Sequence, residues 1–99
     1  MAISFDPGVT FDPAKRDKTL AERGLDFADA SAVFAGITLT LADTRQAYGE
    51  LRWQTYGLLD GRLVMVVWTE RGEDRHVMSM RKCNEREQAE FGGQLGQSG

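Results

Sequence analysis

The first third of the chain carries apolar residues at helical spacing, bounded by start and stop signals. Asp12 has the side chain of a helix N-cap, and Pro13 follows at the first helical position, where no amide hydrogen is needed. This pair predicts a short helix over residues 13–22. Gly24 then supplies the left-handed residue at which such a helix commonly ends.

A second helix is predicted from Asp26 to Gly36. Asp26 is again an N-cap type of residue, and Asp29 adds a negative charge to the first turn. One face of this helix carries its apolar residues, which are Phe27, Ala30, Val33 and Phe34. Both helices are therefore expected to be amphipathic and to depend on packing against another surface.

From Ile37 onward the apolar period changes from that of a helix to that of a strand. Asp60-Gly61 is a strong signal for a hairpin turn of type I′, and Arg71-Gly72-Glu73 predicts a further turn. The strands predicted around these turns cover residues 37–42, 51–59, 63–70 and 75–82. They are expected to form a four-stranded antiparallel meander.

The C-terminal part is predicted to be a short helix and a tail. Asn84, with Glu87 three residues later, is typical of a capping box, and Gly92-Gly93 ends the helix. Residues 94–99 are expected to be a disordered tail. Residues 1–10 form an N-terminal segment with room for a short strand near residues 3–5. The predicted fold is therefore α+β, with one compact domain over residues 11–93, two N-terminal helices, the meander and a C-terminal helix.

Composition fits one globular domain. The chain has 99 residues, of which 41% are hydrophobic and 27% charged. No apolar run approaches the roughly 18 residues that span a bilayer, and the N-terminus lacks the features of a secretory signal. Cys83 is the only cysteine, so a reducing cytoplasm is the expected location. One Cys and one His give no metal-ligand spacing, and we expect neither a metal nor a cofactor.

The formal net charge of −3 lowers the expectation of nucleic-acid binding. The charge is unevenly placed, however. Residues 1–43 hold seven acidic and four basic residues, whereas residues 44–99 hold eight of each. The second half can still present a basic face if its arginines point the same way.

Strand alternation predicts such a face. Three helices can cover about one face of the sheet, and the face rich in Met, Leu and Trp is expected to take them. The other face would be open and carry Arg52, Gln54, Tyr56, Arg75, Ser79 and Arg81. Guanidinium groups can hold phosphates, and a tyrosine ring can stack on a base.

The same residues allow a plainer interpretation. They would then form a solvated sheet face whose arginines pair with Glu50, Glu70 and Asp74. His76, the only histidine, lies among apolar neighbours in the sequence and is interpreted as structural rather than catalytic.

Several motifs resemble, in order and spacing, those of the BrnT family of toxins. The likeness runs from about residue 11 to residue 91. The matching segments are Phe11-Asp12-Pro13-Ala14-Lys15 leading to Gly24 and Phe27, Tyr48-Gly49-Glu50 with Arg52, Thr55 and Gly57-Leu58, Thr69-Glu70-Arg71-Gly72, Ser79-Met80-Arg81-Lys82, and Glu85-Arg86-Glu87.

The resemblance implies a RelE-like fold and an RNA-cleaving, translation-inhibiting toxin of a type II toxin–antitoxin module. It also implies neutralisation by a BrnA-like ribbon-helix-helix antitoxin, which dimerises and represses the operon, so that operator DNA is contacted only through the antitoxin. One departure concerns the first turn. The family usually carries Lys-His before the glycine that ends the first helix, whereas Glu22-Arg23 precede Gly24 here.

Metal-independent RNA cleavage can use the neighbouring 2′-hydroxyl as nucleophile, and it needs proton transfer and stabilisation of charge at phosphorus. We expect Arg71, Arg81 and Arg86 to stabilise this charge, with Glu70 or Lys15 assisting, and the sequence does not identify the general base. The residues expected to bind RNA are Arg23, Arg52, Tyr56, Arg75 and Lys82. The rival hypothesis is a non-catalytic protein of the same fold that binds an antitoxin and acts as a co-repressor.

Overall fold

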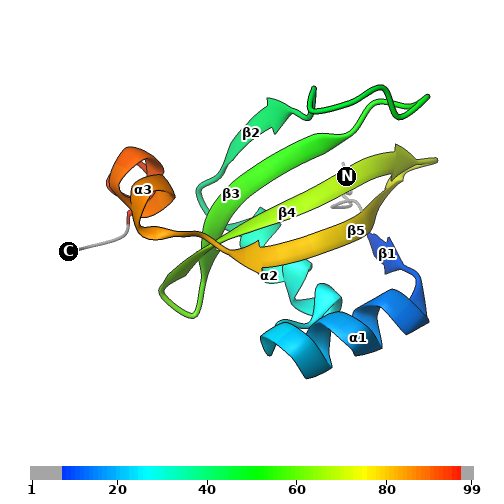
Figure 1. Ribbon diagram of the computed structural model, residues 1–99, viewed down its shortest axis with the longest axis horizontal. Coiled ribbons are helices and arrows are strands. Elements are labelled where there is room, and N and C mark those ends of the chain that lie inside the picture. Colours follow the sequence, from blue (N-terminus) through cyan, green and yellow to red (C-terminus); the bar gives the residue numbers. More distant parts are fainter. Residues whose placement is uncertain (1–7, 97–99) are drawn as a thin grey trace, which may run out of the picture.

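The computed structural model describes residues 8–96, which form a five-stranded sheet with the N-terminal helices packed on one face (Figure 1). The strand order is β1-β5-β4-β3-β2. The α+β class is therefore confirmed. In chain order the elements are β1 (Val9–Phe11), α1 (Pro13–Arg23), the 3₁₀ turn η1 (Phe27–Asp29), α2 (Ala30–Ala35), β2 (Leu39–Ala42), β3 (Trp53–Leu59), β4 (Arg62–Arg71), β5 (Asp74–Lys82), α3 (Glu85–Glu87) and the π-helical turn η2 (Gln88–Gly92).

The helix signals in the sequence are confirmed at both ends of α1. The Asp12 side chain accepts a hydrogen bond from the Ala14 amide at 2.9 Å, and Gly24 adopts a φ of 68° at the C-cap. The second predicted helix is shorter than its pattern. Asp26 caps η1, and α2 follows after that single 3₁₀ turn.

The prediction of four antiparallel strands is wrong in one respect. β1 is a fifth strand and pairs in parallel with β5, with Val9 opposite Arg75 and Phe11 opposite Val77. Three residues between two Asp-Pro pairs carry too short a pattern to be distinguished from a loop. The strand considered near residues 3–5 lies outside the described residues.

The predicted type I′ turn between β3 and β4 is confirmed. Asp60 and Gly61 have φ values of 51° and 76°, and a type I′ turn needs positive φ at both positions. The two strands then pair antiparallel from Leu59 opposite Arg62 to Trp53 opposite Trp68.

A bulge in β5 changes which side chains share a face. Val67 pairs with Ser79 but Trp68 pairs with Val77, so Met78 is the extra residue. Alternation along β5 without a bulge predicts that Arg75 lies on the same face as Arg81. This prediction is wrong, because the extra residue between them turns Arg75 to the opposite face. The Arg75 guanidinium instead lies 4.3 Å from the ring centre of Phe34, on the helix-covered face.

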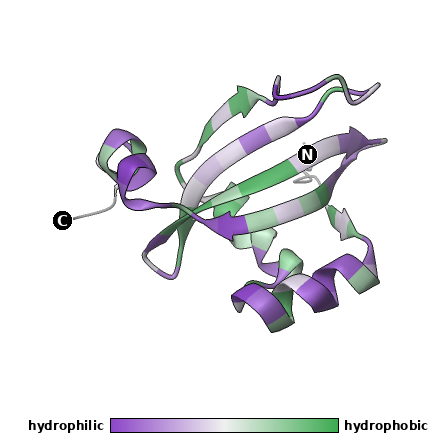
Figure 2. Cartoon of the chain, in the orientation of Figure 1, coloured by the Kyte–Doolittle hydropathy of each residue, from purple (hydrophilic) through white to green (hydrophobic). Residues whose placement is uncertain are grey.

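Each face of the sheet has its own hydrophobic cluster. The first joins helical residues, among them Phe27 and Val33, to Val64, Val66 and Trp68 of β4. The central part of β4 is apolar, because side chains on both faces of this strand are buried (Figure 2).

The second cluster lies on the face that was expected to be open. It comprises Tyr56, Leu63, Met65, Val67, Cys83 and Leu95, with Phe91 packed against it. Leu95 is only 5% exposed, so the packed domain reaches beyond the predicted boundary at residue 93 into the segment expected to be a tail. The C-terminal segment therefore covers one end of this face and does not reach the other, which we call the uncovered end.

Candidate active site

The uncovered end of this sheet face gathers polar side chains from three strands. Thr69 and Arg71 are alternate residues of β4 and so point to the same side. His76 of β5 is opposite Thr69, and Thr10 of β1 is opposite His76. This end of the sheet lies away from α3 (Figure 1).

An ion-pair network lies beside these residues. The Glu50 carboxylate is 3.3 Å from Arg52 Nε and 3.7 Å from Arg71 Nη2. Thr69 Oγ1 donates a hydrogen bond to the Leu51 carbonyl at 2.6 Å, which fixes this loop to β4. The Arg71 side chain remains 56% exposed, so most of its donors are available to a ligand.

The loop between β2 and β3 is organised around a buried carboxylate. Asp43 accepts hydrogen bonds from Arg45 Nε at 2.8 Å, Arg45 Nη2 at 2.7 Å and the Tyr48 hydroxyl at 3.1 Å. The Arg45 hydrogen bonds lower the pKa of Asp43 to about 2 against the opposing effect of burial. The carboxylate is therefore ionised at neutral pH.

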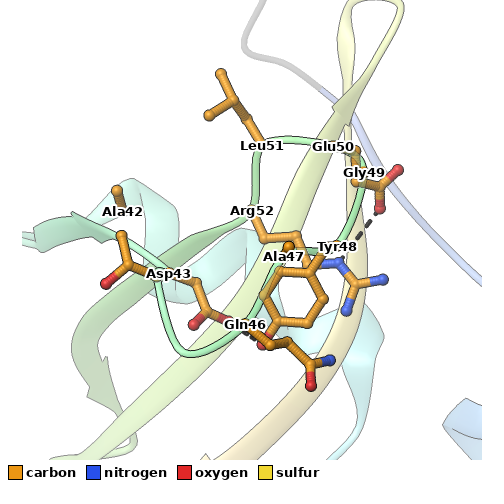
Figure 3. Close-up of a pocket in the computed structure, with 10 residues that line it drawn as sticks. Ala42, Asp43, Gln46, Ala47, Tyr48, Gly49, Glu50, Leu51 and Arg52 are labelled. Atoms are coloured by element: carbon orange, nitrogen blue, oxygen red, sulfur yellow. Dashed lines mark hydrogen bonds and ion pairs between the residues drawn. The ribbon is translucent and has the colours of Figure 1, made fainter.

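The hydrogen bond to Asp43 also holds Tyr48, which contacts Arg52. Tyr48 lies alongside Arg52, whose guanidinium carbon is 4.0 Å from the ring centre, and Glu50 lies beyond it (Figure 3). The loop lines an open cavity of about 500 Å³. The orientation of Arg52 thus depends on a stacked ring that is itself held by a buried charge.

His76 is bound to its neighbour rather than packed among apolar side chains. Its Nδ1 is 2.9 Å from the Thr10 hydroxyl. Burial lowers the pKa of His76, the positive charges of Arg71 and Lys15 lower it further, and Glu50 and Asp12 oppose the shift. The neutral imidazole is therefore the main form at pH 7.

A second hollow adjoins this cluster between α1 and β5. It has a volume of about 200 Å³ and is lined by Lys15, Lys18, Thr19, Glu22 and Arg23 of α1 and by Met78 and Ser79 of β5. Arg23 Nη1 donates to the Met80 carbonyl at 2.7 Å, beyond the last residue that pairs with β1. Lys15 belongs both to this groove and to the surroundings of His76.

The residues predicted for the site are therefore not in one place. Arg71 and Arg52 lie at the uncovered end of the sheet face, Lys15 of α1 lies close enough to His76 to lower its pKa, and Arg23 lines the adjoining groove. Glu70 is exposed and lies opposite Arg75, on the other side of β4 from Arg71. Arg81, Lys82 and Arg86 lie at the far end of the sheet, near α3, where Lys82 and Arg86 are exposed.

Two of the far residues are held in structural contacts. Arg81 makes a bidentate ion pair with Glu87, with both distances at 2.7 Å. Tyr56 is 6% exposed, and its ring centre is 4.6 Å from that of Phe91. The expectation that Tyr56 lies open on the sheet for base stacking is wrong, because the C-terminal segment covers it.

The sequence indicated Glu50 as an ion-pair partner of the arginines, and this pairing is confirmed. It did not indicate that His76 and Tyr48 lie at the same end of the sheet. A signal for His76 was present. The turn around Gly72 places Arg71 opposite Asp74, and counting back along the hairpin places Thr69 opposite His76. No comparable signal pointed to Thr10, because β1 itself was not predicted.

Neither a metal site nor a membrane span is found in the described part of the chain. Between residues 8 and 96, no group of three or more His, Cys, Asp or Glu side chains is arranged to hold a metal ion. No helix in the same range has the length and apolar character needed to cross a membrane.

Fold and site together define a small α+β protein with arginines, lysines and a neutral histidine around an open sheet end. Residues 11–87 match the family described as ribonuclease toxin, BrnT, of type II toxin–antitoxin system. The chain belongs to this family of ribonuclease toxins, which confirms the resemblance drawn from its motifs. A comparison with curated proteins gives no match.

Proposed function

We propose that the protein is a metal-independent endoribonuclease that cleaves RNA at the uncovered end of the sheet face and thereby inhibits translation. One observation carries this proposal: Arg71 and Arg52 converge on Glu50 beside His76 and Lys15. Guanidinium and ammonium groups stabilise the negative charge that develops at phosphorus during attack by the 2′-hydroxyl. The family match supports the choice of RNA as substrate.

The groove between α1 and β5 supports a path for the RNA backbone. Three of the α1 side chains that line it are cationic, namely Lys15, Lys18 and Arg23, against the single carboxylate of Glu22, and Ser79 adds a hydroxyl from the opposite wall. An RNA backbone whose phosphates bind in this groove would pass Lys15 and reach Arg71 at the uncovered end. We assign the exposed Lys82 and Arg86 to backbone contacts farther along the strand, and Arg81 to the support of the C-terminal segment.

We also propose that a BrnA-like ribbon-helix-helix antitoxin neutralises the toxin in the cytoplasm. The support is the family match, because toxins of type II systems are paired with a protein antitoxin. The expected observation is that induced expression arrests bacterial growth and that co-expression of the adjacent small gene restores it.

The direct test is cleavage of single-stranded RNA by the purified protein in EDTA. Wild type should cleave, and Arg71→Ala should be at least tenfold slower, which is about 1.4 kcal/mol in the barrier. Arg62→Gln removes the same charge at the other end of the sheet, where Arg62 donates to the Cys83 carbonyl, and should cleave like wild type.

The outcomes separate this proposal from its rival. Intact RNA with a folded wild-type protein that still binds its antitoxin would support the non-catalytic co-repressor, for which the replacement of Lys-His by Glu22-Arg23 argues. Loss of cleavage on addition of EDTA would contradict metal independence alone.

A further inference from the structure

The reaction needs a group that accepts the proton of the 2′-hydroxyl, and the site offers two neighbours of Arg71 for this task. The Glu50 carboxylate is already engaged by Arg52 and Arg71. The His76 imidazole has one nitrogen at hydrogen-bond distance from Thr10. The other nitrogen, Nε2, makes no hydrogen bond within the described residues.

We propose that His76 accepts the 2′-hydroxyl proton through Nε2 and that Thr10 is the residue that positions the ring. This inference rests on the ribonuclease function proposed above. When Nδ1–H donates to Thr10 Oγ1, at 2.9 Å, the lone pair of the neutral ring lies on Nε2. The pairing of Thr10 with His76 across β1 and β5 holds this contact in the sheet itself.

The surroundings keep the imidazole in the form that the role requires. Arg71 at the end of β4 and Lys15 on α1 lower the pKa of His76, in addition to burial. Glu50 in the β2–β3 loop and Asp12 before α1 act in the opposite direction, but the net shift is downward. A base that is neutral at pH 7 and lies beside cations can take a proton next to a phosphate.

The step balances without any further reactant. The 2′-oxygen forms a bond to phosphorus as its proton passes to His76 Nε2, and the bond from phosphorus to the 5′-oxygen breaks. The 5′-oxygen takes a proton from water, and the imidazolium returns its proton to the hydroxide so formed. The products are a 2′,3′-cyclic phosphate and a 5′-hydroxyl, with no net uptake or release of protons. Arg71 is placed to hold the phosphoryl oxygens throughout.

The first test compares His76→Gln with wild type on single-stranded RNA between pH 5 and pH 8. Wild-type kcat/KM should rise with pH along a limb whose midpoint lies below the ordinary histidine value of about 6.5. His76→Gln should lose about a hundredfold or more at pH 7, in the range of general base catalysis, and lose this limb. Wild-type rates and an unchanged limb in His76→Gln would overturn the proposal.

A second measurement does not depend on how the variant folds. The chain has one histidine, so a single imidazole resonance reports its titration in wild type. Its midpoint should agree with the kinetic limb, and both should move to higher pH in Arg71→Gln, because a positive charge is removed. Disagreement between the two midpoints in wild type would exclude His76 as the base.

Thr10 variants test the positioning role. Thr10→Val should lower kcat with little change in KM and keep the acidic limb, while Thr10→Ser should restore kcat because the hydroxyl returns. Equal kcat values for Thr10→Val and wild type would show that Thr10 does not position the ring. Cleavage by wild type with unaffected His76→Gln defeats this inference alone, whereas a folded wild type that leaves RNA intact defeats the proposed function as well.

Discussion

Arg71 and Arg81 show how two arginines on the same sheet face can have different tasks. Arg71 is more than half exposed, and its Nη2 is 3.7 Å from the Glu50 carboxylate, which also binds Arg52. Arg81 is held by both carboxylate oxygens of Glu87 at 2.7 Å. Exposed ion pairs contribute little to stability, whereas bidentate, partly buried pairs contribute more. The first arginine is therefore available to a substrate, and the second secures the fold.

Arg81→Ala is accordingly expected to act on stability. The substitution removes a bidentate pair and leaves the Glu87 carboxylate, which is 14% exposed, without its main partner. We expect the free energy of unfolding to fall by about 1–3 kcal/mol. Denaturant unfolding measures this change, and Arg71→Ala is the matched variant that should leave it nearly unaltered. Equal losses in both variants would contradict the division of tasks.

Glu87 also predicts a pH dependence. The Arg81 hydrogen bonds lower its pKa from 4.5 to about 2, so the native state favours the carboxylate more than the unfolded chain does. This contribution is fully present above pH 4.5 and is lost as the pH falls towards 2. The stability gap between wild type and Glu87→Gln should therefore shrink over this range. A gap that stays constant from pH 6 to pH 2 would show that the ion pair carries none of it.

At the scale of elements, the C-terminal segment acts as a cover. Asn84 and Glu87 form the predicted capping box, which starts α3 immediately after β5. The chain then turns so that Phe91 and Leu95 pack over Tyr56. Cys83 lies beneath them, and burial raises the pKa of its thiol to about 11.

Cys83 is therefore a reporter of this cover. In the native protein it should react slowly with a thiol reagent at pH 7, because the thiol is buried and protonated. Phe91→Ala should speed labelling at least tenfold and lower stability by about 2 kcal/mol. Leu51→Ala, at a position that is 71% exposed, is the control and should change neither. Fast labelling of wild type would show that the cover is not closed.

The elements with strong local signals could be predicted from the sequence, and those that depend on distant contacts could not. Asp12, Gly24 and the Asp60-Gly61 turn act within a few residues, and each prediction drawn from them is confirmed. β1 is formed by its pairing with the edge of β5, which lies far away in the sequence. The Met78 bulge depends on the register against β4.

The same distinction applies to the candidate site. Motifs drew attention to Arg71 and Lys15, yet the sequence did not show that both lie near His76. The phase inversion at Met78 removed Arg75 from the predicted face, and the fold of residues 91–95 covered Tyr56. The hydrophobic pattern identified the strands. Which side chains of different strands share a face could be determined only from the register of the strands in the structure.

At the scale of the whole molecule, the two faces of the sheet are packed differently. The helices stabilise one face and the C-terminal segment covers one end of the other. The remaining end carries the arginines, the histidine and the groove along α1. A chain with a formal charge of −3 still brings Arg52, Arg71 and Lys15 close to one another at this end.

Cleavage of RNA at the uncovered end by attack of the 2′-hydroxyl can be tested directly. The measurement is the chemistry of the termini that purified wild type leaves on a defined single-stranded RNA in EDTA. We expect 2′,3′-cyclic phosphate and 5′-hydroxyl ends, both strongly reduced in Arg71→Ala. Fragments with 5′-phosphate and 3′-hydroxyl ends, formed by attack of water, would contradict it.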